Sequence, residues 1–188
     1  MADRVKEFHV FVLPEYEQEE EFLREKSRQG YHLVQVKLPG IYYFEKGEPK
    51  DTVYRLDFNP QTGSEKDIYI QMYKDYGWEY IQDLNEYSYF RKDAETTSDE
   101  ELEIFNDNES RLEMADRIFR KKMLPVTLIF LFCSAIFLNY LLSVRNGIHP
   151  FMMGLSIMVC ILMVLYVYIL VRCLAGFSRI RKKYGEQN

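Results

Sequence analysis

Two uncharged apolar runs near the C-terminus constrain this chain more than any other feature of its sequence. The runs extend over residues 124–144 and 151–171, and each is 21 residues long. An α-helix rises ~1.5 Å per residue, so each run is long enough to cross ~30 Å of hydrocarbon. Only the six residues from Arg145 to Pro150 separate them. The sequence therefore predicts a two-helix transmembrane hairpin over residues 124–171, preceded by a soluble domain.

The charges that flank the two runs predict the orientation of the hairpin. Lysine and arginine gather before the first run and after the second, against the single Arg145 between them. Because cytoplasmic flanks carry the excess of Lys and Arg, the hairpin is predicted to cross a cell membrane with both termini cytoplasmic. Residues 172–188 then form a basic cytoplasmic tail. These side chains are expected at the membrane surface, where they attract anionic lipid: Arg117, Arg120, Lys121, Lys122, Arg179, Arg181, Lys182 and Lys183.

The net charge of −5 conceals a division along the chain. Residues 1–123 contain 18 Lys and Arg against 28 Asp and Glu, whereas residues 124–188 contain six against one. The soluble part is therefore acidic. A protein that neutralises phosphates needs a basic face, so direct binding of nucleic acid is not expected.

The soluble part contains an internal repeat. Three blocks match at offsets of 46 or 47 residues: 8–14 with 54–60, 30–35 with 77–82, and 43–46 with 89–92. A period of this size indicates a repeated supersecondary unit. The sequence therefore predicts a domain over residues 1–92 that is built from repeats 5–46 and 53–92.

Each repeat has the pattern of a strand, a helix and two further strands. The strands are rich in aromatic and β-branched residues, and Gly30 and Gly77 are placed to end the two helices. Ser64 is the expected cap of the second helix, which presents an apolar face of Tyr69, Met72, Tyr73 and Tyr76. The predicted class is α+β, with an antiparallel sheet and both helices on one face: strands 5–13, 31–38, 41–46, 53–58, 78–84 and 86–92, and helices 15–29 and 64–76.

This order of elements resembles the duplicated fold of the gyrase-inhibitor-like and SOUL haem-binding-like proteins. The resemblance is one of topology, and it implies a small-molecule ligand in the groove between the repeats. A shared fold does not by itself establish a shared function.

Strand alternation predicts a candidate binding surface on the face of the sheet that the helices leave open. Phe8, Val10 and Val12, with Tyr54, Leu56 and Phe58, are expected to face the helices. Residues 1–92 hold eleven Tyr, six Phe and one Trp, more than a small core buries, so some should line a groove or a partner interface. The alternative is that the charged residues on this face of the sheet pair with one another inside the fold. The predicted surface comprises His9, Phe11, Arg55 and Asp57, with Tyr43 and Tyr89 at its edges.

The sequence shows no catalytic constellation. There is no glycine-rich phosphate loop and no nucleophile elbow. His9, His32 and His149 are far apart and lack metal-ligand spacing, and Cys133, Cys160 and Cys173 all lie in or beside the apolar runs. The chain is therefore predicted not to be an enzyme and to hold no cofactor or metal.

Between the soluble domain and the first apolar run, the sequence predicts two further segments. Residues 93–105 are polar and acidic, as in a flexible linker, and residues 106–123 form an amphipathic helix capped by Asp107 or Asn108. The apolar stripe of that helix, at residues 112, 115, 118 and 119, suits the bilayer or a second copy of the chain. Pro125 is expected to bend the start of the first span.

Several motifs resemble the bacterial family catalogued as domain of unknown function 2812. They are the helix–glycine–aromatic–strand segments at 23–33 (LREKSRQGYHL) and 74–80 (KDYGWEY), then 87–91 (YSYFR) and 104–110 (IFNDNES). Tyr31 stands where a tryptophan would mirror Trp78. The resemblance implies C-terminal membrane spans and a gene encoded beside a transcription regulator of the PadR type. It further implies a sensory or accessory role in envelope or antimicrobial response, and it carries over no catalytic residue.

Two functions follow from these features. The first is a membrane-tethered module that binds a cytosolic ligand, peptide or protein without catalysis. The second is a subunit of an oligomeric channel or transporter, in which the hairpins act and the soluble domains regulate them. Homo-oligomers through the membrane and juxtamembrane helices are compatible with both.

Overall fold

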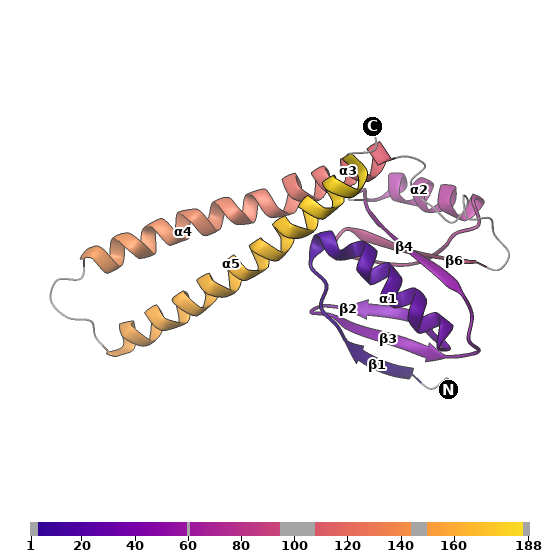
Figure 1. The fold of residues 1–188 in the computed structure, drawn as a ribbon, viewed down its shortest axis with the longest axis horizontal. Coiled ribbons are helices and arrows are strands. Elements are labelled where there is room, and N and C mark those ends of the chain that lie inside the picture. The colour runs from indigo at the N-terminus through magenta and orange to yellow at the C-terminus, as the bar shows by residue number, and fades with distance from the viewer. Residues whose placement is uncertain (1–3, 60, 95–107, 144–149, 186–188) are drawn as a thin grey trace. The chain divides into compact units, whose positions relative to one another are not determined.

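The computed structural model describes residues 4–59, 61–94, 108–143 and 150–185. The chain divides into two compact units, Met1–Met114 and Ala115–Asn188, and each is described by itself (Figure 1). From residue 95 onward the predicted acidic linker lies outside the described residues, as does the loop at 144–149 with Arg145 and His149.

The first half of the first unit is a three-stranded antiparallel sheet with one helix. It consists of β1 (Arg4–Phe8), α1 (Tyr16–Arg28), β2 (Tyr31–Lys37) and β3 (Ile41–Lys46), with the strands in the order β1-β3-β2. β1 is shorter than predicted. After Phe8 the chain leaves the sheet, and Phe11 packs against Phe22 of α1 with ring centroids 5.7 Å apart. A short 3₁₀ helix with Pro14 in its first turn then leads into α1.

The second half follows the same order of elements. It consists of β4 (Thr52–Phe58), α2 (Ser64–Asp75), β5 (Glu79–Leu84) and β6 (Tyr87–Asp93), and its strands lie in the order β4-β6-β5. A register shift interrupts β2 between Leu33 and Gln35, and another interrupts β5 between Tyr80 and Gln82. Gly30 and Gly77 follow the two helices with φ of +84° and +80°, as predicted. Gly63, rather than Ser64, caps α2.

The mixed α+β class is confirmed, but the prediction of a single antiparallel sheet is wrong: the described strands form two separate sheets. The edge strands β2 and β5 are joined by a side chain instead of a backbone ladder. The amide of Gln82 donates to the carbonyl of Val36 at 2.9 Å and accepts from the N–H of Val36 at 3.0 Å. The bulge beside Gln82 explains the break, because a bulge increases local twist and turns a strand away from regular pairing.

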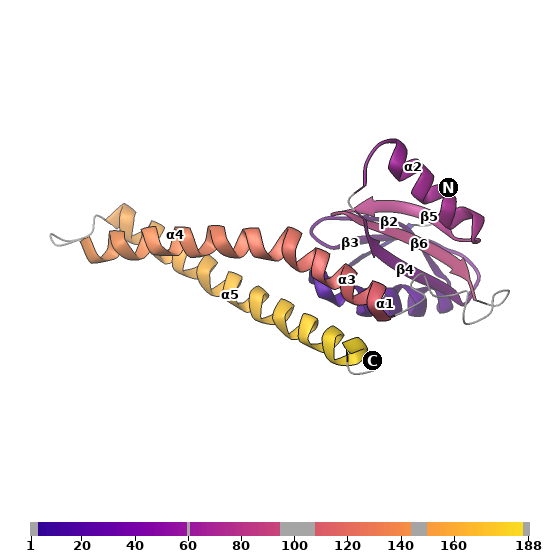
Figure 2. The same cartoon turned by 90° about the horizontal axis from the view of Figure 1, so that it is seen from above.

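The prediction that both helices cover one face is also wrong, because α1 and α2 lie on opposite faces of the second sheet (Figure 2). Toward α1, the hydroxyl of Tyr89 donates to Glu19 at 2.6 Å. Toward α2, the hydroxyl of Tyr69 donates to Asp57 at 2.7 Å. β4 is consequently buried on both sides. Its free edge is also covered, since the N–H of Leu56 donates to the carboxylate of Glu20 on α1 at 2.8 Å.

The hydrophobic core divides between these faces. Under α2, Val53, Tyr69, Trp78 and Phe90 form one buried cluster. The residues expected to face a helix behave differently in the two repeats: Tyr54, Leu56 and Phe58 are buried, whereas Phe8 and Val10 are 67% and 46% exposed. Phe8 is the last residue of the short edge strand β1, and Val10 lies beyond it, where the chain has left the sheet.

The connection between the two halves is held to α1 by a carboxylate clamp. Asp51 accepts two hydrogen bonds from Arg24, at 2.7 and 2.8 Å, and two from Arg28, at 3.0 and 2.9 Å. These hydrogen bonds hold the pKa of Asp51 well below its ordinary value, with Arg24 as the larger cause.

Replacing Asp51 with asparagine is expected to lower the free energy of unfolding by roughly 1–2 kcal/mol at pH 7, because the paired carboxylate is lost. Since the folded-state pKa is depressed, this contribution is present above the ordinary pKa of 3.8 and is lost as the pH falls through the folded value. In urea unfolding, the difference in free energy of unfolding between the wild type and Asp51→Asn should be smaller at pH 3 than at pH 7. A difference in free energy of unfolding that stays constant with pH would contradict the clamp. Asp75→Asn, at an exposed position, is the control.

The described part of the second unit is helical. Helix α3 (Asn108–Ile118) begins in the first unit and ends in the second, where a π-helical turn at Phe119–Met123 leads into α4 (Leu124–Ser143), and α5 (Pro150–Gly185) follows. The wide turn has a local cause: Pro125 lacks an N–H, and its ring would clash with the carbonyl of residue 121 in a regular helix. Accordingly, the N–H of Leu124 donates to the carbonyl of Phe119 in the π pattern.

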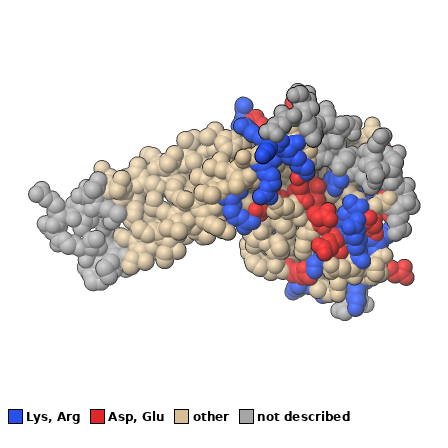
Figure 3. All heavy atoms as spheres, in the orientation of Figure 1, with Lys and Arg blue, Asp and Glu red and all other residues tan. Residues whose placement is uncertain are grey.

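Helices α4 and α5 pack as an antiparallel pair. Phe119 contacts Phe177, and Phe130 stacks on Tyr166 with ring centroids 4.1 Å apart. The hydroxyl of Tyr166 donates to Thr127 at 2.9 Å. Two stretches, Leu112–Asn139 and Ser156–Tyr184, are long and apolar enough to span a membrane, and Figure 3 shows an uncharged surface along the middle of the pair.

Candidate ligand-binding cleft

The six residues predicted to form an open binding face do not converge. His9 and Phe11 stack at 4.3 Å, and both rings also contact Phe22 of α1, on the side that the helix covers. The guanidinium of Arg55 lies 3.5 Å from Glu20. Asp57 is buried under α2.

The two tyrosines predicted at the edges of that face also lie apart. Tyr89 is buried and donates to Glu19, which also accepts from Tyr42 at 2.7 Å. Burial raises the pKa of Glu19, and the two hydroxyl donors partly oppose that effect. Tyr43 lies between the ammonium groups of Lys6 and Lys37, each 5.4 Å from its ring. The predicted surface is therefore wrong as a continuous face, because the helices lie on opposite sides of the second sheet.

A different site lies where the ends of the two sheets meet. It is a cleft of about 580 Å³ within the first unit. β2 and β3 contribute from the first half, β5 and β6 contribute from the second, and the connection between the halves lies beside them. We call this site the inter-sheet cleft, and its lining is mostly charged: His32, Glu45, Lys46, Gly47, Lys50, Thr52, Gly77, Glu79, Arg91, Lys92 and Asp93.

Ion pairs fix part of this lining. Arg91 donates two hydrogen bonds to Glu79, at 2.8 and 2.7 Å, and Lys50 lies 2.6 Å from Asp93. The hydrogen bonds from Arg91 lower the pKa of Glu79 and keep it ionised. The ring of His32 is engaged at both nitrogens, 3.1 Å from the hydroxyl of Ser27 and 2.9 Å from the carbonyl of Glu48. His32 therefore shapes the wall and has neither nitrogen directed at a ligand.

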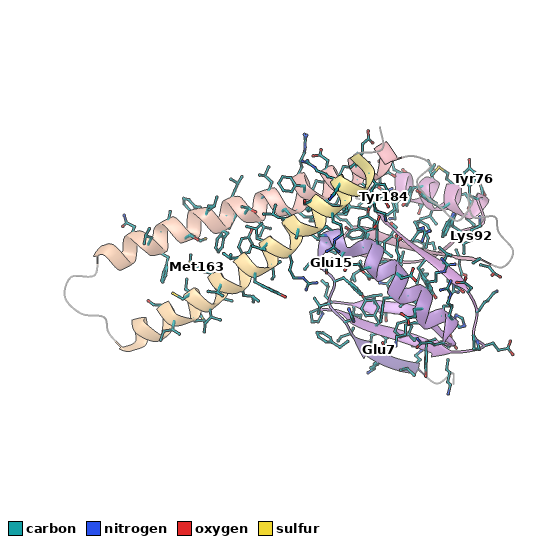
Figure 4. All side chains as sticks on the ribbon, in the orientation of Figure 1. Glu7, Glu15, Tyr76, Lys92, Met163 and Tyr184 are labelled. Atoms are coloured by element: carbon teal, nitrogen blue, oxygen red, sulfur yellow. The ribbon has the colours of Figure 1, made fainter. Side chains whose placement is uncertain are left out.

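Two lysines at the ends of β3 and β6 supply positive charge to the cleft. Lys46 is exposed. Lys92 lies beside Tyr76 (Figure 4) and donates to its carbonyl at 2.9 Å. The ammonium of Lys92 lies 5.7 Å from the ring centre of Trp78. Trp78 is the only tryptophan of the chain, so its emission can report on this wall. With carboxylates beside these lysines, the cleft is suited to a small polar molecule that carries charge.

Comparison with known families gives one match. The model of the family described as protein of unknown function (DUF2812) matches residues 15–129. The chain belongs to the DUF2812 family. No match is found among curated proteins or among solved structures.

The DUF2812 match extends from the start of α1 into α4. It therefore includes every residue of the inter-sheet cleft and also reaches the first of the two apolar helices. The resemblance inferred from the sequence motifs is confirmed at the level of the family. One of those motifs, residues 104–110, lies mostly outside the described residues.

A second polar cluster in this DUF2812 domain is structural. The ammonium of Lys66 donates to Asp83 at 2.8 Å and to the hydroxyl of Ser88 at 2.5 Å. A serine beside a lysine can act as a nucleophile and its base. Here Ser88 has no exposed surface and its own hydroxyl donates to Asp83, so a substrate has no access to it. Among the described residues, no group of three or more His, Cys, Asp or Glu side chains is placed to hold a metal ion.

The basic residues predicted at the membrane surface fall on two segments of the DUF2812 chain. One group lies in α3 and the π-helical turn, and the other lies near the end of α5. The contact between Phe119 and Phe177 places these segments at the same end of the helix pair. The first group consists of Arg117, Arg120, Lys121 and Lys122, and the second of Arg179, Arg181, Lys182 and Lys183.

The topological resemblance implies a ligand groove between the repeats, but none of the residues that line the inter-sheet cleft was among the predicted site residues, although the sequence holds a signal for them. The repeat pairs Glu45 with Arg91 and Lys46 with Lys92 at an offset of 46 residues. Equivalent charged positions at strand ends mark where two related halves can build one site. Finding the cleft also required knowing that these ends meet, which depends on how the sheets associate.

Proposed function

We propose that this protein is a non-enzymatic, membrane-anchored binding module of a sensory or regulatory kind, which takes a small charged ligand in the inter-sheet cleft. One observation carries the proposal: both halves of the first unit line a single cleft with side chains of both charges. A ligand held there touches both halves, so binding favours one arrangement of the two sheets over others.

We further propose that the two halves arose as a duplicated unit. Three features support this: the order of elements, the order of strands within each sheet, and the irregularities at Val34 and Ile81, which are 47 residues apart. Duplication accounts for a site in which Lys46 and Lys92 occupy equivalent positions at the ends of β3 and β6.

The anchor in this proposal is the α4–α5 pair, with the soluble domain and both termini in the bacterial cytoplasm. The basic residues at one end of the pair support that orientation, because positive charge remains on the cytoplasmic side. They also suit contact with anionic lipid headgroups.

Cysteine labelling tests this orientation. In a chain whose three native cysteines are replaced by serine, Ser178→Cys should react with a membrane-impermeant maleimide only in inverted vesicles or opened cells. Gly147→Cys should react in intact spheroplasts, since it lies in the loop between the two apolar runs. If both positions react from the same side, the hairpin orientation is rejected.

Ligand binding is tested by thermal unfolding of the full chain in detergent, followed by circular dichroism, against a panel of small carboxylates, phosphates and amino acids. A ligand present at 100 times its Kd stabilises the folded state by about 2.7 kcal/mol, which corresponds to a rise in Tm of several degrees. The same ligand should change the emission of Trp78, because Lys92 lies beside that ring.

Matched variants locate the binding. Lys46→Glu should abolish the thermal shift because it reverses charge in the cleft, and Lys74→Glu, also at an exposed lysine but on α2, should leave it unchanged. If no class of compound shifts the Tm, or if the shift survives Lys46→Glu, the inter-sheet cleft is not the ligand site.

A further inference from the structure

Helix α2 turns a row of large apolar side chains away from the core that it covers. Ile68 and Tyr76 are each 72% exposed, and Met72 is 46% exposed. Their spacing of four residues places them in one line along the helix. On the neighbouring face of the helix, Tyr69 is buried against Val53 and Phe90, so the outward orientation of the row is fixed by the core.

A polar row runs beside the apolar one. Asp67, Gln71 and Asp75 have the same spacing, and Gln71 donates to Asp75 at 2.7 Å. The two rows line one shallow surface groove. The groove is thus apolar along one side and acidic along the other.

We propose that this α2 groove docks an amphipathic helix of a partner protein, with apolar residues along one stripe and lysine or arginine beside it. A helix matches the groove because residues four apart form ridges that pack into the grooves of a second helix. The partner should carry basic residues beside its apolar stripe, because Asp67 and Asp75 attract positive charge and repel negative charge.

Charge favours this partner over two other occupants of the groove. A second copy packed antiparallel through the same row would bring Asp67 of one chain toward Asp75 of the other, and the like charges would repel. An anionic membrane surface would be repelled by the same two carboxylates.

The test uses the full chain in nanodiscs of neutral phosphatidylcholine and two fluorescein-labelled helical peptides. Both peptides carry leucine at every fourth position; one is flanked by lysine and the other by glutamate. Fluorescence anisotropy should show binding of the lysine peptide, no binding of the glutamate peptide, and no binding to empty nanodiscs. A lysine peptide of scrambled order should bind at least about tenfold more weakly, because it has no continuous stripe.

Variants assign the binding to α2. Met72→Ser should weaken binding of the lysine peptide about tenfold. Leu38→Ser, at a leucine that is 68% exposed in the turn between β2 and β3, should change it less than about twofold. Asp67→Lys combined with Asp75→Lys should reverse the preference between the two peptides. Unchanged Trp78 emission verifies that each variant is folded.

Three results would overturn the proposal. The first is equal binding of the ordered and scrambled lysine peptides. The second is a doubling of the particle mass with concentration that Ile68→Ser abolishes, which would identify the groove as an interface between copies. The third is attachment to anionic vesicles that depends on Ile68 and Tyr76.

Discussion

Replacement of Trp78 by alanine is expected to lower the free energy of unfolding of the first unit, Met1–Met114, by about 3–5 kcal/mol. The indole is only 3% exposed and packs with Val53, Tyr69 and Phe90 under α2. Alanine would remove that apolar area and leave a cavity, which the short helix and the three-stranded sheet cannot close without losing their other contacts.

Pulse proteolysis in urea measures this loss without the fluorescence of the missing indole. Trp78→Phe is the matched control, and it should cost less than half as much because the aromatic ring remains. A loss near zero for Trp78→Ala would place the indole on a binding surface and remove it from the core.

Gly40→Ala is expected to have the second-largest effect, a loss of roughly 2–4 kcal/mol. Gly40 has φ of +140°, and a Cβ there would lie 2.2 Å from the carbonyl oxygen of His9. That neighbour is backbone, and the segment is held by the hydrogen bond from the N–H of His9 to the carbonyl of Gly40 at 2.9 Å. The turn between β2 and β3 would have to move away from β1.

Urea unfolding followed by Trp78 emission measures this effect, since Trp78 reports on the other half of the domain and also shows whether the halves unfold together. Gly63→Ala is the control: φ is +62°, but a Cβ at that position meets nothing within 4 Å. It should cost only about 1 kcal/mol. Equal losses for the two variants would show that φ, and not the close approach to His9, sets the cost.

The secondary structure was largely predictable because its signals are local. Gly30 and Gly77 marked the ends of both helices, and aromatic and β-branched runs marked the strands to within a residue or two, except β1. The association of the sheets was not predictable. It depends on the amide of Gln82 binding the backbone of Val36, and no pattern in the sequence distinguishes that glutamine from an exposed one.

The candidate site failed at the sequence level for the same reason. Alternation predicted Asp57 on an open face, and Tyr89 was predicted at the edge of that face, on the assumption that both helices lie on one side of one sheet. In the structure, Asp57 contacts α2 and Tyr89 contacts α1. Glu19 and Glu20 of α1 bind the second sheet through hydrogen bonds that periodicity cannot reveal.

The most direct test of the central claim is an experimental structure of the full chain, determined with a compound that raises its Tm. The account predicts ligand density in the inter-sheet cleft, within hydrogen-bonding distance of Lys46 from the first half and of Lys92 from the second. Density that instead lies beside His9 and Phe11, or that contacts only one of the two halves, would contradict it.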